Sequence, residues 1–273
     1  MRIATWNLQR LEKRKNQQIL DKLADINADI LVLTETSSKI HLDNYNCIST
    51  DPLPTNFDNI KYDIGENRVS IWTKYKTATR HKTFDSFTTV CTDIETPFGL
   101  LTVYGSIIGV FANRQPRFDN DLNGQLADFK KNFTGRQVCF AGDLNVTFSG
   151  RAWPSNKARQ ALEDAFKIYN LTNTTDNIDG TVDHIVLSNS FLDNKHLQID
   201  TWNTDRKLSD HVGHLLTLTQ WTEEKKPPLK RVWQKWRFSA PQTHLWLIKV
   251  WFSASIPILR NGENRHLRQA RNR

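Results

Sequence analysis

The sequence has few cysteines and lacks other features that would place it in several classes of protein. Its cysteines are Cys47, Cys91 and Cys139, and no two of them form a C-x-x-C pair. A disulfide framework or a cysteine zinc site is therefore not expected, and a reducing cytoplasm is the expected location. No uncharged apolar run reaches about 18 residues, and no charged-then-apolar leader opens the chain. We therefore expect neither a membrane span nor secretion.

An overall acidic charge is also absent, and the positive charge is unevenly placed. The 273 residues carry a formal net charge of +8. Residues 222–273 contain 5 Lys and 7 Arg against 3 Glu, whereas residues 1–221 contain 25 basic and 26 acidic side chains. The segment 223–228, with its charges and paired prolines, suits a linker. We expect a near-neutral domain over residues 1–221 and a basic, tryptophan-rich extension over residues 222–273.

Strand-like and helix-like segments alternate through the domain, beginning with a β-α-β unit. Residues 2–7 read as a strand, 17–26 carry apolar side chains at helical spacing, and 30–33 form a continuous apolar run typical of a buried strand. Further strands are predicted at 69–73, 88–94, 100–104, 137–141, 184–188 and 215–219, helices at 120–133 and 158–169, and a loop at 51–59. This alternation predicts an α/β fold.

Polar side chains recur at one kind of place, the ends of the predicted strands. The set consists of Asn7, Glu35, Asp143, Asn145, Asp183, Asp210 and His211. Strand ends in an α/β sheet line a common crevice, so we expect these side chains to form one active site. Asp143 and Asn145 are two residues apart, and on an extended segment both would emerge on the same side and point at one ligand.

Carboxylates, amides and one imidazole in a shared crevice indicate metal-assisted hydrolysis. Glu35 and Asp210 offer the oxygen ligands that suit a hard cation such as Mg²⁺ or Mn²⁺. Asp143 would hold and deprotonate an attacking water, with Asn145 orienting that water. His211 would meet a phosphate oxygen rather than the metal. Taken singly, such polar residues also have an ordinary explanation as turn or helix caps.

Six short pieces of the sequence resemble the endonuclease/exonuclease/phosphatase superfamily. They are T-W-N-L at 5–8, L-T-E-T at 33–36, V-Y-G at 103–105, G-D-L-N at 142–145, V-D-H-I-V-L-S at 182–188 and S-D-H at 209–211. Each piece is weak alone, but the six occur in the family's order and cover the domain at 1–221, which argues against chance.

The resemblance implies a fold and a cofactor. The fold is a four-layer α/β sandwich, in which two packed mixed β-sheets are flanked by helices, here followed by the basic extension. The activity is Mg²⁺-dependent cleavage of phosphoesters. By position, Asn7 and Glu35 resemble the family's metal-site pair, and Asp210 resembles a further carboxylate on the metal side.

The resemblance also implies catalytic roles for five residues. Asp143 and Asn145 look like the pair that handles the attacking water. Tyr104 looks like a phosphate contact. Asp183 would orient His211 through a ring N–H.

Departures from the family pattern bear on the substrate. Residues 67–71 stand where the family often has a small, glycine-led segment, and Tyr104 is followed by Gly-Ser rather than by a polar residue and proline. Abasic-site endonucleases usually carry an aromatic, arginine-rich stretch before the equivalent of 182–183, and residues 173–180 have neither feature. This argues against a dedicated abasic-site enzyme. Glu66 matches an acidic residue of the deoxyribonuclease branch only poorly.

The extension contains two segments with different affinities. Residues 230–237 interleave cations with indoles, a pattern that suits phosphate contact and base stacking on single strands. Residues 245–259 are apolar but short and contain Pro257, which favours an interfacial segment over a spanning one. A nucleic acid is therefore the expected partner, with an anionic membrane surface reached through residues 230–260 as a second candidate. A weakly ordered extension without a role is the alternative, and no protein partner is inferred.

The sequence therefore favours a cytoplasmic, Mg²⁺-dependent phosphodiester hydrolase, a nuclease that cleaves DNA by metal-assisted in-line attack of water. Two alternatives stay open. One is a phosphatase or phosphodiesterase on a small or lipid phosphate, because the domain at 1–221 is near neutral. The other is a non-catalytic protein that binds nucleic acid or membrane. His184 and His214 match no site position, and we expect both to be packing residues.

Overall fold

Two six-stranded β-sheets form the centre of the computed structural model, which describes residues 1–11, 13–109 and 115–221. The strand order in the first sheet is β13 (Lys195–Trp202), β14 (Gly213–Gln220), β1 (Arg2–Asn7), β2 (Ile30–Ser37), β6 (Glu66–Thr73) and β3 (Asn46–Ser49). The order in the second is β11 (Leu171–Asn173), β12 (Asp183–Ser188), β10 (Val138–Asp143), β9 (Gly99–Ile107), β8 (Thr89–Thr96) and β7 (Thr77–His81). The pairs β1–β2 and β9–β10 are parallel and the other pairs are antiparallel, so both sheets are mixed.

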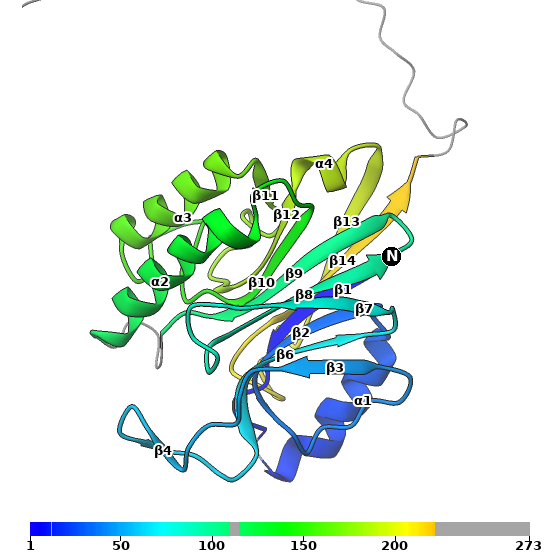
Figure 1. Cartoon of the computed structure of the whole chain (residues 1–273). Helices are drawn as coiled ribbons and strands as arrows, with labels where there is room; N and C mark the ends of the chain where they lie inside the picture. The colour runs from blue at the N-terminus through cyan, green and yellow to red at the C-terminus, as the bar shows by residue number, and fades with distance from the viewer. Residues whose placement is uncertain (12, 110–114, 222–273) are drawn as a thin grey trace, which may run out of the picture. The chain divides into compact units, whose positions relative to one another are not determined.

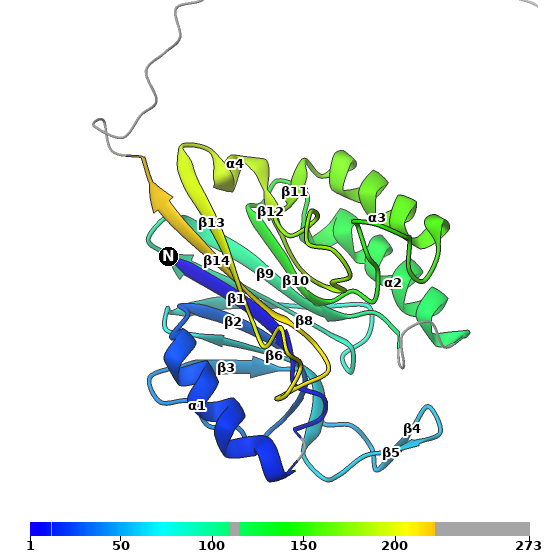
Figure 2. The same ribbon diagram turned by 180° about the vertical axis from the view of Figure 1, so that it is seen from behind.

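Helices cover the outer face of each sheet. The short helix η1 (Lys13–Lys15) leads into α1 (Asn16–Ile26), which packs on the first sheet, while α2 (Arg117–Asn132) and α3 (Asn156–Ile168) pack on the second (Figures 1 and 2). A single turn, α4 (Asn189–Leu192), follows β12, and β4 (Asn56–Phe57) with β5 (Ile60–Lys61) forms a separate hairpin. The order of layers is helix, sheet, sheet, helix, which confirms the predicted four-layer sandwich.

Alternation of side chains explains why the central strands read as continuous apolar runs. In β10, Cys139 and Ala141 face the first sheet, whereas Val138 and Phe140 face α2 and α3. In β2, the odd and even positions divide in the same way between the α1 layer and the space between the sheets. Both faces of these strands are buried, so every position favours an apolar residue.

The predicted strands and helices all occur, and the strands that the sequence analysis missed lie mainly at sheet edges. β3 and β7 are edge strands in which no residue is buried, and β13 is an edge strand with one buried residue. Such strands lack the apolar runs that reveal central strands. The short strand β11 was also missed. The predicted loop at 51–59 contains β4, so that prediction was wrong for two residues. No helix in the described part of the chain is long and apolar enough to cross a membrane.

Several sequence predictions concern residues outside the described part of the chain. They are the linker at 223–228, the extension at 222–273, the cation–indole segment at 230–237 and the interfacial segment at 245–259. The domain boundary at residue 221 and the membrane surface proposed for 230–260 also stay predictions.

Candidate active site

The two sheets meet at one end through a hydrogen bond between Asn7 and Asp143. Asn7 is the last residue of β1, Asp143 is the last residue of β10, and Asn7 Nδ2 donates to Asp143 Oδ2 at 2.9 Å. Asp183 opens β12, which runs antiparallel to β10, and it pairs directly with Asp143. All three side chains are buried. The structure thus brings strand ends from both sheets together.

The chain leaves β10 through a bent backbone that fixes Asp143. Gly142 has a φ of +135°, and a Cβ atom there would collide with the carbonyl oxygen of Ser106, so only glycine fits. Asn145 has a φ of +50°, a left-handed conformation that asparagine tolerates better than most residues. Its backbone N–H donates to Asp143 Oδ1 and its Nδ2 donates to the Ile108 carbonyl, both at 2.9 Å. The expectation of an extended G-D-L-N segment was therefore wrong. The segment is a turn in which the Asn145 N–H holds the Asp143 carboxylate by a hydrogen bond.

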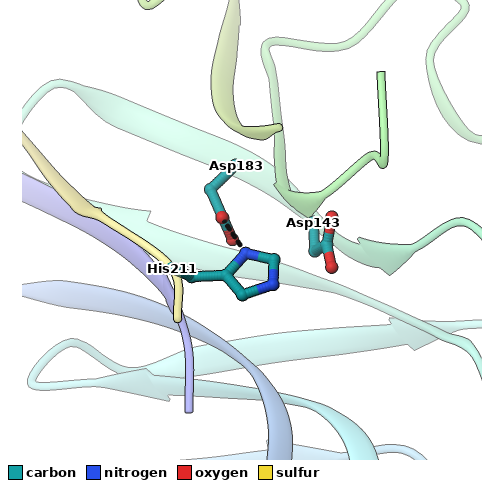
Figure 3. Close-up of side chains that lie close together, drawn as sticks. All are labelled: Asp143, Asp183 and His211. Carbon is teal, nitrogen blue, oxygen red and sulfur yellow. Dashed lines mark hydrogen bonds and ion pairs between the residues drawn. The ribbon is translucent and has the colours of Figure 1, made fainter. Parts of the chain in front are cut away.

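His211 lies between Asp183 and Asp143, and Figure 3 shows its two ring nitrogens turned toward the two carboxylates. Nδ1 donates to Asp183 Oδ2 at 2.6 Å, and one ligand atom of each of the three side chains lies within 4.8 Å of the other two. Burial alone lowers the pKa of His211, but the negative charges of Asp183 and Asp143 outweigh burial and raise the pKa to about 10. The ring is therefore a cation near neutral pH when no metal is bound. Asp143, Asp183 and His211 together could also hold a metal ion, but His211 would then have to lose its Nε2 proton.

Asp143 has a pKa that suits proton transfer near neutral pH. Burial raises the pKa of Asp143 to about 7, the charges of Asp183 and Glu35 act in the same direction, and the charge of His211 and the hydrogen bond from Asn7 oppose them. A general base works best when its pKa lies near the working pH. The environment of Asp143 meets this condition.

The loop that carries His211 is fastened to β1. Trp6 Nε1 donates to the His211 carbonyl at 3.0 Å, and Ser209 Oγ donates to the Asn7 carbonyl at 2.7 Å. Asn203 Nδ2 donates to the carbonyls of Ser209 at 2.8 Å and His211 at 2.7 Å. Sequence reasoning gave none of these donors a role. Trp6 and Ser209 stand inside matched family fragments, which is a signal that was available, whereas nothing in the sequence pointed to Asn203.

Glu35 lies in the last half of β2, two residues before its end at Ser37 and close to the level of Asn7. Asn7 pairs with Thr34 in the parallel β1–β2 ladder, so Glu35 is one residue further on. Its φ of +47° breaks the alternation of the strand. Its carboxylate has no hydrogen-bond or ion-pair partner among the described residues, although its charge helps to raise the pKa of Asp143. A partly exposed carboxylate of this kind is open to a cation.

Asp210 is an exposed carboxylate next to His211. Its side chain is 61% exposed, and its Oδ1 lies 3.8 Å from His211 Nε2. Its backbone N–H donates to Gln9 Oε1 at 3.1 Å. Asp210 lines a pocket with Asn145 and His211, whereas Glu35 lines a separate small cavity of about 20 Å³.

Tyr104 is not part of the site, so the prediction of a phosphate contact was wrong. The ring is fully buried between the second sheet and α2, against Phe129 and Phe140, and its hydroxyl donates to Asp128 Oδ2 at 2.9 Å. The alternation of β9 turns Tyr104 toward the helices. The register also pairs Asp143 with Ile107, three residues beyond Tyr104, so Tyr104 stops short of the strand end.

His184 and His214 are packing residues, as the sequence analysis expected. His184 Nε2 donates to the Val146 carbonyl and Nδ1 accepts from Thr175 Oγ, both at 2.9 Å. Burial lowers the pKa of His184 to about 4, so the ring is neutral. His214 Nε2 lies 2.6 Å from the hydroxyl of Thr181, and burial lowers its pKa as well. These neutral rings support β12 from within the protein.

Arg68 is a charged residue near the site that sequence reasoning missed. It is 2% exposed, its Nη2 donates to the Gly109 carbonyl at 2.6 Å, and its Nε and Nη1 have no partner among the described residues. Arg68 lines the same small cavity as Glu35. Glu66, which the sequence analysis set aside, binds Arg10 with its two carboxylate oxygens at 2.8 and 3.0 Å. For Arg68, the available signal in the sequence was a single arginine beside the apolar residues of a buried strand.

The family of the chain follows from a comparison with family models. The model described as the endonuclease/exonuclease/phosphatase family matches residues 4–211. The chain therefore belongs to this family and is an enzyme of the phosphoesterase type. Enzymes of the family generally use divalent metals. No curated protein sequence is a significant match.

Solved structures with the same fold include endonucleases and a phosphatase bound to product DNA. The endonuclease domain of TRAS1, a telomere-specific non-LTR retrotransposon, matches with a TM-score of 0.58 and 16% identity over 80% of this chain and 97% of its own. The 3′ phosphatase NExo from Neisseria, bound to a product DNA hairpin, matches with 0.59 and 16% over 81% and 100%. An AP endonuclease from Archaeoglobus fulgidus matches with 0.58 and 13% over 80% and 98%. At these identities the likeness shows the shared fold.

Proposed function

We propose that the protein is a Mg²⁺-dependent phosphodiester hydrolase that acts as a nuclease on DNA. The observation that carries this proposal is the buried network in which Asn7 and Asp183 hold Asp143 and His211 at the joined ends of the two sheets. A carboxylate with a pKa near 7 and an imidazolium with a pKa near 10 form a matched base and acid. Hydrolysis of a phosphodiester by water needs both.

The residues on the first-sheet side fit a hard divalent cation. Glu35 offers a carboxylate without a hydrogen-bond or ion-pair partner in the described part of the chain. Asp210 offers an exposed carboxylate, and Asn7 offers an amide oxygen that already accepts the Gln9 N–H at 2.8 Å. An all-oxygen donor set suits Mg²⁺ or Mn²⁺ rather than softer metals. We therefore propose that Glu35, Asn7 and Asp210 hold the ion. Such a cation, when bound, neutralises negative charge on the phosphate oxygens.

The second-sheet side supplies the proton chemistry. Asp143 would take the proton of the attacking water, and its two oxygens are held by the amide groups of Asn7 and Asn145 so that their remaining lone pairs keep a fixed direction. His211 would donate its Nε2–H to a phosphate oxygen that gains charge during attack. Asp183 would keep the imidazole protonated and oriented through Nδ1. Direct in-line attack on phosphorus requires no covalent enzyme intermediate.

The choice of DNA rests on similarity and on the extension. Two of the similar structures are described as endonucleases, and a third is a phosphatase bound to DNA. The basic, tryptophan-rich residues 222–273 would add affinity for a polyanion. A small or lipid phosphate is the rival substrate. The cytoplasmic location suggested by the cysteine pattern belongs to this proposal as well.

A substrate panel tests the proposal. The full chain is assayed with Mg²⁺ or with EDTA on plasmid DNA, a single-stranded oligonucleotide, an inositol phosphate and sphingomyelin. We expect DNA to be cleaved and EDTA to abolish cleavage. Asp143→Asn and His211→Ala should each lower turnover by about 10²–10⁴-fold. His41→Ala is the matched control, since His41 forms an exposed pair with Asp43 at 3.6 Å.

Two results would contradict the proposal. Near-normal hydrolysis by Asp143→Asn or His211→Ala would remove the mechanism. Cleavage of inositol phosphate or sphingomyelin without cleavage of DNA would show that the substrate is a small or lipid phosphate and not DNA. A chain ending at residue 221 should keep hydrolysis and lose part of its DNA affinity, which separates catalysis from binding by the extension.

A further inference from the structure

A pocket of about 370 Å³ opens directly beside His211. Its lining includes Asn145, Asp183 and His211 of the site together with Trp153, Asp179 and Arg206. Its size is at the lower end of pockets that bind small planar ligands. Because groups of the proposed catalytic site line the pocket, a ligand there would lie beside the phosphate that reacts.

Trp153 is exposed although the loop around it is firmly held. The side chain is 45% exposed, whereas Trp6, Trp72 and Trp202 are each at most 8% exposed. Trp153 N–H donates to Thr147 Oγ and Thr147 N–H donates to the Trp153 carbonyl, both at 2.9 Å. The two residues therefore close the loop at 147–153 and fix the base of the indole.

Arg159 of α3 braces the same loop from inside. Its Nε donates to the Thr147 carbonyl at 2.6 Å, its Nη2 donates to the Ser149 carbonyl at 3.3 Å, and both its Nη1 and Nη2 donate to the Gly150 carbonyl at 3.2 Å. The indole is thus held in place while its surface faces solvent at the pocket. An aromatic face kept exposed on a rigid support is suited to stacking on a ligand.

Arg206 offers a positive charge at the edge of the pocket. It stands in a turn closed by its N–H on the Asn203 carbonyl at 2.9 Å, and no described residue binds its exposed guanidinium. A planar aromatic surface and an unpaired cation beside an acid–base pair match a nucleotide, which carries a flat neutral base and a charged backbone. An inositol ring or a lipid chain has no π-face for the indole.

We propose that Trp153 stacks on the base of the nucleotide next to the scissile phosphate and that Arg206 contacts the backbone of the same strand. The inference rests on the proposed nuclease function and narrows its substrate. A base in a duplex already stacks on both neighbours, so its faces are not available to an indole. The enzyme therefore prefers single-stranded or frayed DNA over intact duplex.

The test combines a protein change with a substrate change. Cleavage rates are measured on a single-stranded oligonucleotide with a mapped cleavage position, with a normal or a tetrahydrofuran abasic residue on either side of that position. Trp153→Ala should lower kcat/KM by about 5- to 150-fold, the range expected for one base–aromatic stack. Removing the stacked base should cost the wild type a similar factor and cost Trp153→Ala nothing more. Trp153→Phe should restore most of the activity.

Arg206→Gln serves as the contrasting variant. It should weaken activity equally with and without the base, and it should lower the salt dependence of binding by about one ion. Trp153→Ala losses that are equal on both substrates, or absent, would overturn the stacking proposal. Thermal unfolding of each variant checks that the loop at 147–153 still folds.

A binding assay keeps this proposal separate from the nuclease proposal. Full-length Asp143→Asn, with and without Trp153→Ala, is titrated in EDTA with labelled single-stranded DNA that carries or lacks the base. If the wild type fails to cleave DNA, the nuclease proposal fails and this assay alone decides the role of Trp153. Base-dependent loss of affinity on Trp153→Ala supports stacking, and equal affinity refutes it.

Discussion

Asp183→Asn is the substitution that most directly tests the charge network. It keeps the size of the side chain and an acceptor for His211 Nδ1, and it removes one buried negative charge. With a pKa of about 10, His211 is fully protonated at pH 7.5. If loss of Asp183 returned the pKa to the ordinary value of about 6.5, only about 10% of the rings would be protonated. Turnover at pH 7.5 should therefore fall by about tenfold from protonation alone, and further from lost orientation.

Nuclear magnetic resonance of the metal-free protein measures the same quantity without catalysis. The imidazole nitrogens of His211, assigned by their loss in His211→Ala, should titrate near pH 10 in the wild type and well below that in Asp183→Asn. Asp43→Asn, which changes the exposed pair with His41, is the control and should leave His211 unchanged. Titration of wild-type His211 near pH 6.5 would refute the argument.

The pH dependence of stability gives an independent check with a defined sign. The pKa of His211 is raised on folding, so its contribution to stability is fully present below the unfolded pKa of about 6.5 and is lost as pH rises through about 10. The free energy of unfolding should decrease over this window more steeply in the wild type than in Asp183→Asn. Identical slopes in urea titrations at a series of pH values would contradict this expectation.

Three further substitutions probe the remaining assignments. Glu35→Gln should weaken metal binding by about tenfold or more, measured by Mg²⁺ titration of activity and by calorimetry, and unchanged affinity would remove Glu35 from the metal site. Tyr104→Phe should leave turnover within about twofold and lower the free energy of unfolding by about 0.5–1.5 kcal/mol, because half-buried Asp128 loses one donor and keeps the Phe84 N–H; a large loss of turnover would restore Tyr104 to the site. Gly142→Ala should destabilise the protein by about 3 kcal/mol or more through collision with the Ser106 carbonyl, seen by thermal unfolding, and wild-type stability would show that the turn can adapt.

The central strands could be predicted from sequence because burial on both faces leaves a clear pattern. Residues 30–33 and 138–141 are apolar throughout, and they lie in the middle of the two sheets. Edge strands gave no such signal. In β13, five of the eight side chains are exposed, so its sequence is free to mix Lys, Gln and Asp with apolar residues. Such a strand is held by pairing to β14, an interaction between segments that local sequence does not encode.

The residues of the candidate site also differ in how far sequence could predict them. Asn7, Asp143, Asp183 and His211 were expected to converge, and the structure brings them into one hydrogen-bonded network. The ends of neighbouring strands lie at the same edge of a sheet whatever the details of packing. The position of each residue along its strand was therefore sufficient to predict that these side chains converge. Tyr104 failed because its place in the site depended on which face of β9 it occupies and on the register against β10. Both are properties of the assembled sheet.

The site also depends on how closely the two sheets pack. Glu35 and Asn7 belong to the first sheet, Asp143 and Asp183 belong to the second, and the Asn7–Asp143 hydrogen bond joins them. The sheets approach so closely that a Cβ atom at Gly105 would lie 2.8 Å from Val69 Cγ1. A misplacement of about 1 Å between reacting groups lowers rates by about 10²-fold. The apolar core between the sheets therefore sets the spacing between the metal-side residues and the residues that handle the proton.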